Sequence, residues 1–263
     1  MHNSQPIQHI FIDLSFFCVQ RGHIFKDLSY NGKPTGIYYG ILSLVKGLRE
    51  SYPDTAIHIC RDGNPVAIRR KYPAYKINRD EVSYKPSKDF AMLKNLQKML
   101  VCYPKVYVWY DIEQEADAVI ASLALQKPLT SVVCSGDNDF LQLMSEGIRV
   151  AKSIRSKKFD FRTEEYIIEK YGVTSNNLLI FRALQGDKSD NISGVVSTKE
   201  ARLLISGKKD FNELTDEQMK AFELNVDIMS LLKYTREPLK LKPLQITPDK
   251  DLFNVFGLEK LLP

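Results

Sequence analysis

Apolar residues follow two different periods along the chain, and the two kinds of segment alternate. Short runs rich in β-branched and aromatic residues are typical of buried strands. They predict strands over residues 7–14, 55–62, 105–111, 130–137 and 148–154. Longer segments with apolar residues three and four positions apart are typical of helices. They predict helices over residues 35–51, 87–102 and 115–126, the first with Thr35 as its N-cap.

The pattern changes after residue 155. Three helical segments follow one another at residues 164–171, 176–185 and 198–206, and the stretch 234–247 is irregular and contains prolines. Strands that alternate with helices imply a parallel sheet covered on both faces. We therefore predict an α/β fold in which a central, mostly parallel sheet is flanked by helices and is followed by a helical C-terminal part.

The composition is that of an ordinary globular protein with a basic excess. The 263 residues carry a net charge of +5, and 44% are hydrophobic. No apolar run reaches the length of a membrane helix, and residues 1–10 lack the features of a signal peptide. Four separated cysteines without a CxxC pair indicate reduced thiols, and four scattered histidines do not suggest a zinc site. We expect a cytoplasmic protein with no membrane partner.

Much of the basic excess lies between residues 65 and 100. This segment contains nine Lys or Arg residues against three acids, and Tyr72, Tyr75, Tyr84 and Phe90 lie among them. Positive charges combined with aromatic faces are how proteins grip single-stranded nucleic acid. The spacing alone fits equally well with a solvated helix face whose tyrosines anchor it to the protein.

Acidic residues stand at the ends of the predicted strands. Asp13, Asp62 and Asp137 each fall at the carboxyl end of a strand. In a parallel sheet these ends meet at one edge, which is where ligands bind. Five more acids are expected to join them there: Glu115 and Asp117 at the start of a helix, Asp139 two residues after Asp137, and Asp187 and Asp190 in a later loop.

Carboxylates held close together repel one another unless something positive lies between them. Their hard oxygen ligands suit Mg²⁺ or Mn²⁺, and eight acids are too many for one ion. A two-metal site activates a water and stabilises the leaving oxygen of a phosphodiester. Each acid also has a structural interpretation: Asp62 could start a turn with Gly63, and Asp137 and Asp139 could cap a helix.

Four stretches carry a resemblance to a known family. They are "RDGNPVAIRRKYPAYKINRD", "QEADAVIASLA", "VCSGDNDFLQL" and "ALQGDKSDNISGV", in the family's order. The chain resembles the 5′-nuclease, or flap endonuclease, family, which includes bacteriophage enzymes and the 5′-nuclease domains of bacterial DNA polymerases. The resemblance covers nearly the whole chain. It implies a PIN-like nuclease core at residues 1–172 with a helical arch at about 64–102, and a helix-turn-helix-like C-terminal subdomain at residues 173–263 that completes the metal site.

The resemblance also implies roles for individual residues. Lys76 and Arg79 match the two catalytic arch cations that contact the scissile phosphate, and Tyr75 is expected to offer a stacking face to the terminal base. Arg69, Arg70 and Lys199 are expected to contact the substrate. The residues similar to the family's ligands for two Mg²⁺ or Mn²⁺ ions are Asp13, Asp62, Glu115, Asp117, Asp137, Asp139, Asp187 and Asp190.

Two positions depart from the family's pattern. The helix motif has Ala118 in place of a further Asp, as in eukaryotic and archaeal relatives, and Asp111 or Glu113 could add a carboxylate nearby. After "NISGV" the family usually has a glycine-containing hairpin that grips duplex phosphates and often a potassium ion. This chain reads "VSTKEA", which is shorter and has no glycine. Because glycines let backbone N–H groups approach phosphate closely, we expect no potassium-specific benefit.

These features predict a Mg²⁺-dependent 5′–3′ exonuclease and structure-specific flap endonuclease. The expected partners are DNA with 5′ single-stranded ends or flaps, RNA–DNA hybrids at primers, and the replication machinery, and we expect a monomer. A non-catalytic nucleic-acid-binding relative stays open as an alternative, which the full set of acids disfavours. A phosphatase or nucleotidyl-transfer enzyme is a third class, which needs a small-molecule pocket in place of the basic segment.

Overall fold

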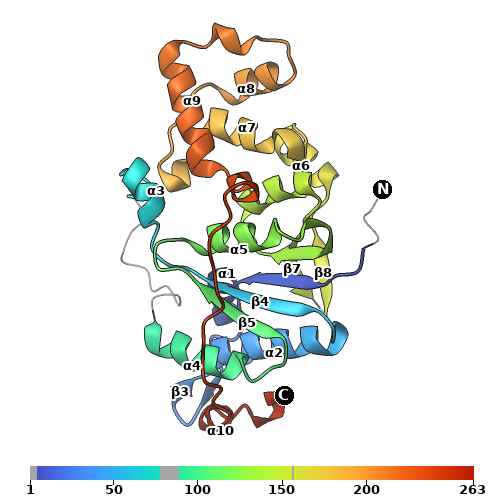
Figure 1. Ribbon diagram of the computed structural model, residues 1–263. Coiled ribbons are helices and arrows are strands. Elements are labelled where there is room, and N and C mark those ends of the chain that lie inside the picture. The colour runs from blue at the N-terminus through green and yellow to red at the C-terminus, as the bar shows by residue number, and fades with distance from the viewer. Residues whose placement is uncertain (1–4, 78–88, 156) are drawn as a thin grey trace.

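A computed structural model describes residues 5–77, 89–155 and 157–263, and its centre is a sheet (Figure 1). Among these residues, six strands form the main sheet in the order β5-β4-β1-β6-β7-β8. The first five of these run parallel, and β8 pairs antiparallel with β7 at one edge. The strands are β1 (His9–Asp13), β4 (Ala56–Arg61), β5 (Val106–Tyr110), β6 (Ser131–Cys134), β7 (Arg149–Arg155) and β8 (Lys158–Phe161). The predicted α/β fold with a mostly parallel sheet is confirmed.

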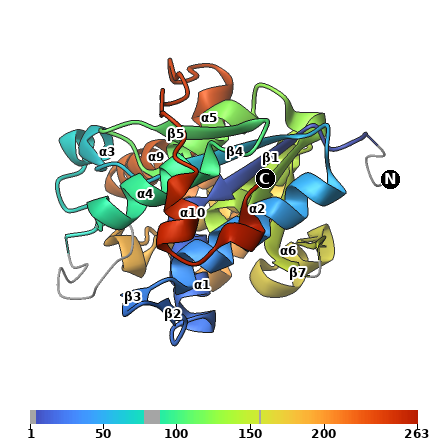
Figure 2. The ribbon, with the colours of Figure 1, turned by 90° about the horizontal axis from the view of Figure 1, so that it is seen from below.

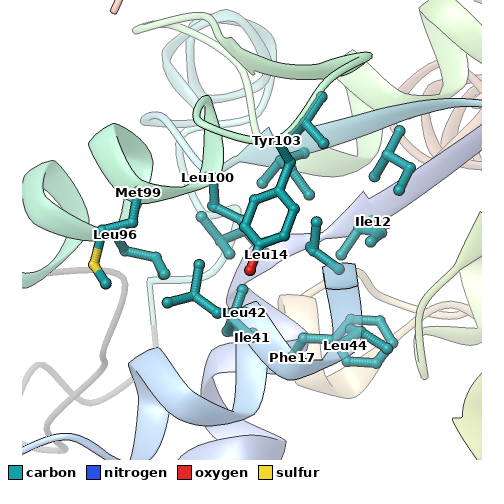
Figure 3. Packing of buried hydrophobic residues seen from close by; sticks show 14 of the residues in the cluster. Ile12, Leu14, Phe17, Ile41, Leu42, Leu44, Leu96, Met99, Leu100 and Tyr103 are labelled. Carbon is teal, nitrogen blue, oxygen red and sulfur yellow. The ribbon is translucent and has the colours of Figure 1, made fainter. Parts of the chain in front are cut away.

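Helices cover both faces of this sheet, because successive residues of a strand point to opposite sides. Ile10 and Ile12 of β1 pack into one hydrophobic cluster, whereas Phe11 between them packs into the other. Figure 3 shows Ile12 in the first cluster, together with Leu42 and Leu100 of the covering helices. The helices that contribute to the first cluster include α1 (Leu14–Ile24), α2 (Gly36–Ser51) and α4 (Phe90–Leu100), and α5 (Ala116–Ala124) contributes to the second.

The strand β1 passes directly into α1, a helix that the sequence pattern does not predict. Asp13 ends β1 and is also the N-cap of α1, where its carboxylate accepts a hydrogen bond from the N–H of Phe16 (3.1 Å). Residues 14–19 are mostly apolar and partly aromatic, so they look like a continuation of the strand. The pattern also misses β2 (Ser29–Tyr30), β3 (Lys33–Pro34), α3 (Val66–Lys71) and β8.

A helical part follows the sheet and forms the top of Figure 1. Three of its helices are predicted, and they are α6 (Glu164–Tyr171), α7 (Ser175–Gln185) and α8 (Thr198–Ile205). The pattern misses α9 (Asp216–Met229), in which polar residues are as numerous as apolar ones and the buried residues are Asn225 and Ile228. Among the described residues, no helix combines the length and the apolar character that a membrane crossing requires.

The chain then returns to the sheet through residues 230–249, which we call the strap. The N–H of Leu239 donates to Ser122 Oγ (2.7 Å), and the N–H of Leu244 donates to the carbonyl of Val108 on β5 (2.8 Å). Beyond the strap, α10 (Asp251–Val255) packs near α4 and buries Phe253 in the first cluster (Figure 2). The end of the chain thus packs on the core of the sheet, and the division into units at residues 1–172 and 173–263 stays a prediction.

His58 on β4 is buried among aromatic rings. Its Nδ1 accepts a hydrogen bond from Trp109 Nε1 (3.0 Å), and its Nε2 lies 3.1 Å from His9 Nδ1. Phe11 stacks on it with 4.5 Å between the ring centroids. Burial, helped by His9 and by the charge of Lys127, lowers the pKa of His58 to about 3. The imidazole is therefore neutral in the folded protein at pH values where the unfolded chain would protonate it.

We expect His58→Gln to reduce the acid sensitivity of the fold. The pKa of His58 is about 3 when folded and 6.5 as its ordinary value, so its contribution to stability is complete above pH 6.5 and is lost as the pH falls toward 3. Glutamine can replace both hydrogen bonds but cannot titrate. Between these pH values the wild type should therefore lose more unfolding free energy in urea titrations than the variant. Parallel pH profiles would contradict the assignment.

Candidate active site

The structure brings three of the predicted aspartates together at the carboxyl edge of the sheet. Asp13 ends β1, Asp62 follows β4, and Asp137 lies beyond β6. Asp13 accepts a hydrogen bond from Ser135 Oγ (2.8 Å), and Asp62 accepts one from the N–H of Ala116 at the start of α5 (2.8 Å). Burial, followed by the nearby charge of Asp62, raises the pKa of Asp13 to about 7.

Two acids at the start of α5 lie close to these aspartates. Asp117 is half-buried in the first turn of the helix. Removal from water, followed by the charge of Glu115, raises its pKa well above the ordinary value, and Asp137 and Asp62 add to the rise. Glu115 occupies the N-cap position of α5, but its side chain makes no capping hydrogen bond. Its carboxylate is therefore available to groups outside the helix.

A second group of acids consists of Asp139, Asp187 and Asp190. Asp139 lies in the first turn of η3 (Asn138–Glu146), and the other two belong to the loop after α7. One carboxylate oxygen of each lies within 4.8 Å of the others. Burial, followed by the charge of Asp137, raises the pKa of Asp139 to about 7, which shows that the two groups adjoin. We call the acidic centre the full set of Asp13, Asp62, Glu115, Asp117, Asp137, Asp139, Asp187 and Asp190.

The expected arch cation Lys76 lies on carboxylates of the acidic centre. Its Nζ is 2.7 Å from Glu115 and 3.6 Å from Asp190, and 9% of its side chain is exposed. Burial alone would lower the pKa of Lys76, but Glu115 and the neighbouring acids outweigh it and raise the pKa. The N–H of Lys76 donates to the carbonyl of Asp190 (2.9 Å), and its φ is +56°. This backbone region is therefore fixed to the loop that carries Asp190.

Tyr75 lies beside Lys76 with 4% of its surface exposed. Its hydroxyl donates to Glu115 (2.9 Å) and lies 3.2 Å from Asp190. The hydroxyl contacts and the surrounding apolar side chains hold the ring inside the protein, and the stacking role that the resemblance implies for Tyr75 stays a prediction. The structure thus places Tyr75 as a support of two acids.

Arg182 on α7 is a site residue that the sequence reasoning misses. Its Nη2 is 2.9 Å from Asp139 and 2.5 Å from Asp187, so one guanidinium contacts both. Burial would lower the pKa of Arg182, but these two carboxylates outweigh it and raise the pKa. The available signal was an arginine in the otherwise apolar stretch "LLIFRAL", five residues before Asp187.

The other predicted residues lie outside this network or outside the described residues. Arg70 forms an exposed ion pair with Glu113 (3.0 Å), and Arg69 Nε donates to the carbonyl of Tyr75 (3.4 Å). Lys199 is exposed in the first turn of α8. Arg79 lies outside the described residues.

Ala118, which stands where the family often has a further acid, is buried and lines a narrow cavity beside acids of both groups. The carboxylates considered as substitutes are engaged elsewhere. Glu113 pairs with Arg70, and Asp111 accepts a hydrogen bond from the N–H of Glu113 (2.8 Å). The acidic centre is therefore built from the eight predicted residues without their help.

The acidic centre fits hard divalent cations, because its ligand atoms are carboxylate oxygens. Lys76 and Arg182 can offset two of its eight carboxylates, so a strong negative potential remains. Burial, followed by the charges of neighbouring acids, raises the pKa values of Asp13 and Asp139. Added positive charge would let these groups ionise and would stabilise the fold.

A mostly parallel sheet with clustered acids at its carboxyl edge is suited to bind metal ions, and the adjacent basic segment is suited to bind nucleic acid. A family model described as "5′-3′ exonuclease, N-terminal resolvase-like domain" matches residues 9–172 of the chain. The chain belongs to this 5′–3′ exonuclease family, and the resemblance noted in the sequence is confirmed.

Curated relatives agree with this assignment. A 5′–3′ exonuclease of Buchnera aphidicola (from Acyrthosiphon pisum) is 32% identical over 209 residues, which cover 75% of this chain and 69% of the relative. DNA polymerase I of Pseudomonas aeruginosa is 30% identical over 209 residues, but these cover 22% of the polymerase. The chain thus spans about a fifth of the polymerase relatives it matches.

Solved structures show that the fold is shared. A flap endonuclease of bacteriophage T5, solved with DNA and metal ions, has a TM-score of 0.65 at 17% identity and covers 88% of this chain and 92% of its own. Human GEN1, solved with Holliday junction DNA, has a TM-score of 0.56 at 19% identity and covers 98% of this chain and 69% of its own.

We expect Asp13→Asn to stabilise the metal-free protein at high pH. The pKa of Asp13 is about 7 when folded against an ordinary 3.8, so the wild type loses stability as the pH rises from 3.8 to 7, and the penalty is complete above 7. Asparagine can accept from the N–H of Phe16 through its Oδ1 and can donate an amide N–H to Ser135 Oγ, but it carries no charge. In EDTA, thermal unfolding should give the variant a higher melting temperature at pH 8 and little difference near pH 4. Asp251→Asn at an exposed position serves as a control, and a lower melting temperature of Asp13→Asn at pH 8 would refute the prediction.

Proposed function

We propose that the chain is a divalent-metal-dependent 5′–3′ exonuclease and structure-specific flap endonuclease. The observation that carries the proposal is the convergence of eight carboxylates at the sheet edge in a member of the 5′–3′ exonuclease family. The proposed substrate is DNA with 5′ single-stranded ends or flaps, and RNA–DNA hybrids are included because this chemistry does not require a particular base. Replication partners and a monomeric state stay predictions.

The acidic centre offers ligands for two Mg²⁺ or Mn²⁺ ions. Asp13, Asp62, Asp117 and Asp137 would hold one ion, and Asp139, Asp187 and Asp190 would hold the other, with Glu115 beside the first group. When bound, such ions supply an activated water and stabilise charge on the leaving oxygen. The chain's own contribution is to hold the carboxylates at the sheet edge and to bring cationic side chains to the phosphate.

Lys76 is the described cation best placed to act on the scissile phosphate. It stays protonated in its present position on Glu115, and cations at the acidic centre would compete with it for that carboxylate. Lys76 can then donate to the phosphate, where negative charge develops during cleavage. Arg79 is proposed as its partner on grounds of the sequence match, as a residue able to contact phosphate through two N–H groups.

Duplex binding by the shortened hairpin would depend on side chains. The N–H groups of Val195 and Val196 both donate to the carbonyl of Leu184 (2.8 and 3.2 Å), so they are occupied within the protein. Ser197 caps α8 by accepting from the N–H of Glu200 (3.2 Å). These contacts support a phosphate contact through the Lys199 side chain, and a binding mode without a requirement for potassium.

Cleavage of a 5′-flap substrate tests the proposal, with Asp139→Asn as the variant. Asp139 belongs to the second group of acids, so the substitution should lower the single-turnover rate by orders of magnitude in saturating Mg²⁺ while flap binding in Ca²⁺ persists. Matched flap, nicked, single-stranded and hybrid substrates would show the preferred structure. Binding without cleavage by the wild type would favour the non-catalytic alternative, and near-normal turnover of the variant would exclude Asp139 as a ligand.

Lys76→Ala separates catalysis from binding. If Lys76 acts on the developing charge, the single-turnover rate should fall by about 100-fold with a much smaller change in substrate affinity, because an interaction specific to the transition state accelerates chemistry. Lys71→Ala is the matched control, since Lys71 is an exposed lysine of the same segment that pairs with Asp227 (2.7 Å). An equal loss of affinity and rate in Lys76→Ala would make it an ordinary phosphate contact.

A further inference from the structure

The three acids of the second group come from two separate parts of the fold. Asp139 is held at the sheet by η3, which follows β6, whereas Asp187 and Asp190 lie in the loop after α7. Their oxygens nevertheless lie within 4.8 Å of one another, although like charges so close repel. Some contact must therefore hold the loop against Asp139.

Arg182 makes that contact. Its Nη2 lies between Asp139 Oδ1 (2.9 Å) and Asp187 Oδ2 (2.5 Å), and 19% of the side chain is exposed. Asp187 is fixed further by the N–H and the hydroxyl of Ser189, which donate to its other oxygen at 2.8 and 2.6 Å. The guanidinium thus joins the ordered loop to the part of the centre that belongs to the sheet.

The helix that carries Arg182 is a rigid support. Its neighbours Phe181, Leu178 and Leu184 are all buried in the second hydrophobic cluster, and α7 packs against η3. The Nε of Arg182 is buried without a hydrogen-bond partner among the described residues. The contacts of Nη2 with the two carboxylates therefore set the position of the guanidinium.

We infer that Arg182 is a positioning residue that links the 187–190 loop to Asp139 and thereby builds the second divalent-cation site. The inference rests on the proposed function for the identity of the ions as Mg²⁺ or Mn²⁺. It assigns Arg182 a role through Asp139 and Asp187, and no contact with substrate.

A positioning role and a purely electrostatic role of Arg182 predict opposite changes in cation affinity when Arg182 is replaced. If the arginine only offset negative charge, its removal would leave more negative potential, and cations would bind more tightly. If it positions the loop, its removal separates Asp187 from Asp139, and cation affinity falls in spite of the increased negative charge. Loss of a group that orients metal ligands typically weakens affinity by about 10- to 100-fold.

The experiment measures Mn²⁺ binding to the DNA-free full chain by electron paramagnetic resonance, together with hydrogen exchange of the loop amides in EDTA. In Arg182→Met we expect Mn²⁺ binding at the second site to weaken by at least about 10-fold. The amides of Ser189 and Asn191, which are hydrogen-bonded in the loop, should exchange faster, while the sheet amides stay protected. Protected sheet amides also show that the variant is folded.

Two further variants complete the test. Arg182→Lys keeps the charge but not the guanidinium, so it should bind Mn²⁺ more weakly than the wild type. Arg202→Met removes a nearby arginine that donates to the carbonyl of Tyr171 (3.0 Å), and it should bind Mn²⁺ as the wild type does. Unchanged or tighter Mn²⁺ binding by Arg182→Met, or full rescue by lysine, would overturn the inference. Because the assay uses neither DNA nor cleavage, its failure is distinct from failure of the proposed function.

Discussion

The close approach of eight carboxylates is the constraint on which the rest of this structure depends. Their repulsion is visible in the raised pKa values of Asp13, Asp117 and Asp139, which burial and neighbouring acids produce together. Free energy from folding must hold these groups in place until cations arrive. A large hydrophobic core on each face of the sheet provides that free energy.

Cationic side chains from parts of the chain far apart in sequence compensate this negative charge. Lys76, next to the basic segment, lies on Glu115, and Arg182, in the C-terminal helical part, lies between Asp139 and Asp187. The two cations differ in how they are held. Arg182 extends from a buried helix, whereas Lys76 follows a short turn and has a positive φ, a conformation that is uncommon for lysine.

The sequence allows the sheet and the acids to be predicted because both depend on local signals. Alternating strands and helices imply a parallel sheet, and a parallel sheet brings strand ends such as Asp13 and Asp62 to one edge. Long-range contacts leave no such signal. The sequence near Arg182 gives no sign of its bond to Asp139. The burial of Tyr75 depends on Asp190, more than a hundred positions away, and the return of the strap depends on distant contacts such as the backbone bond from Leu244 to β5.

That bond at Leu244 has a consequence for the protein's behaviour toward other chains. β5 is the last strand on its side of the sheet, and an uncovered strand of this kind is a template for pairing with a neighbouring molecule. The strap occupies the carbonyl of Val108 and runs along this edge before α10 packs beneath it. The C-terminal segment thus blocks pairing of this edge strand with a strand of another molecule. This role is separate from any contact with nucleic acid.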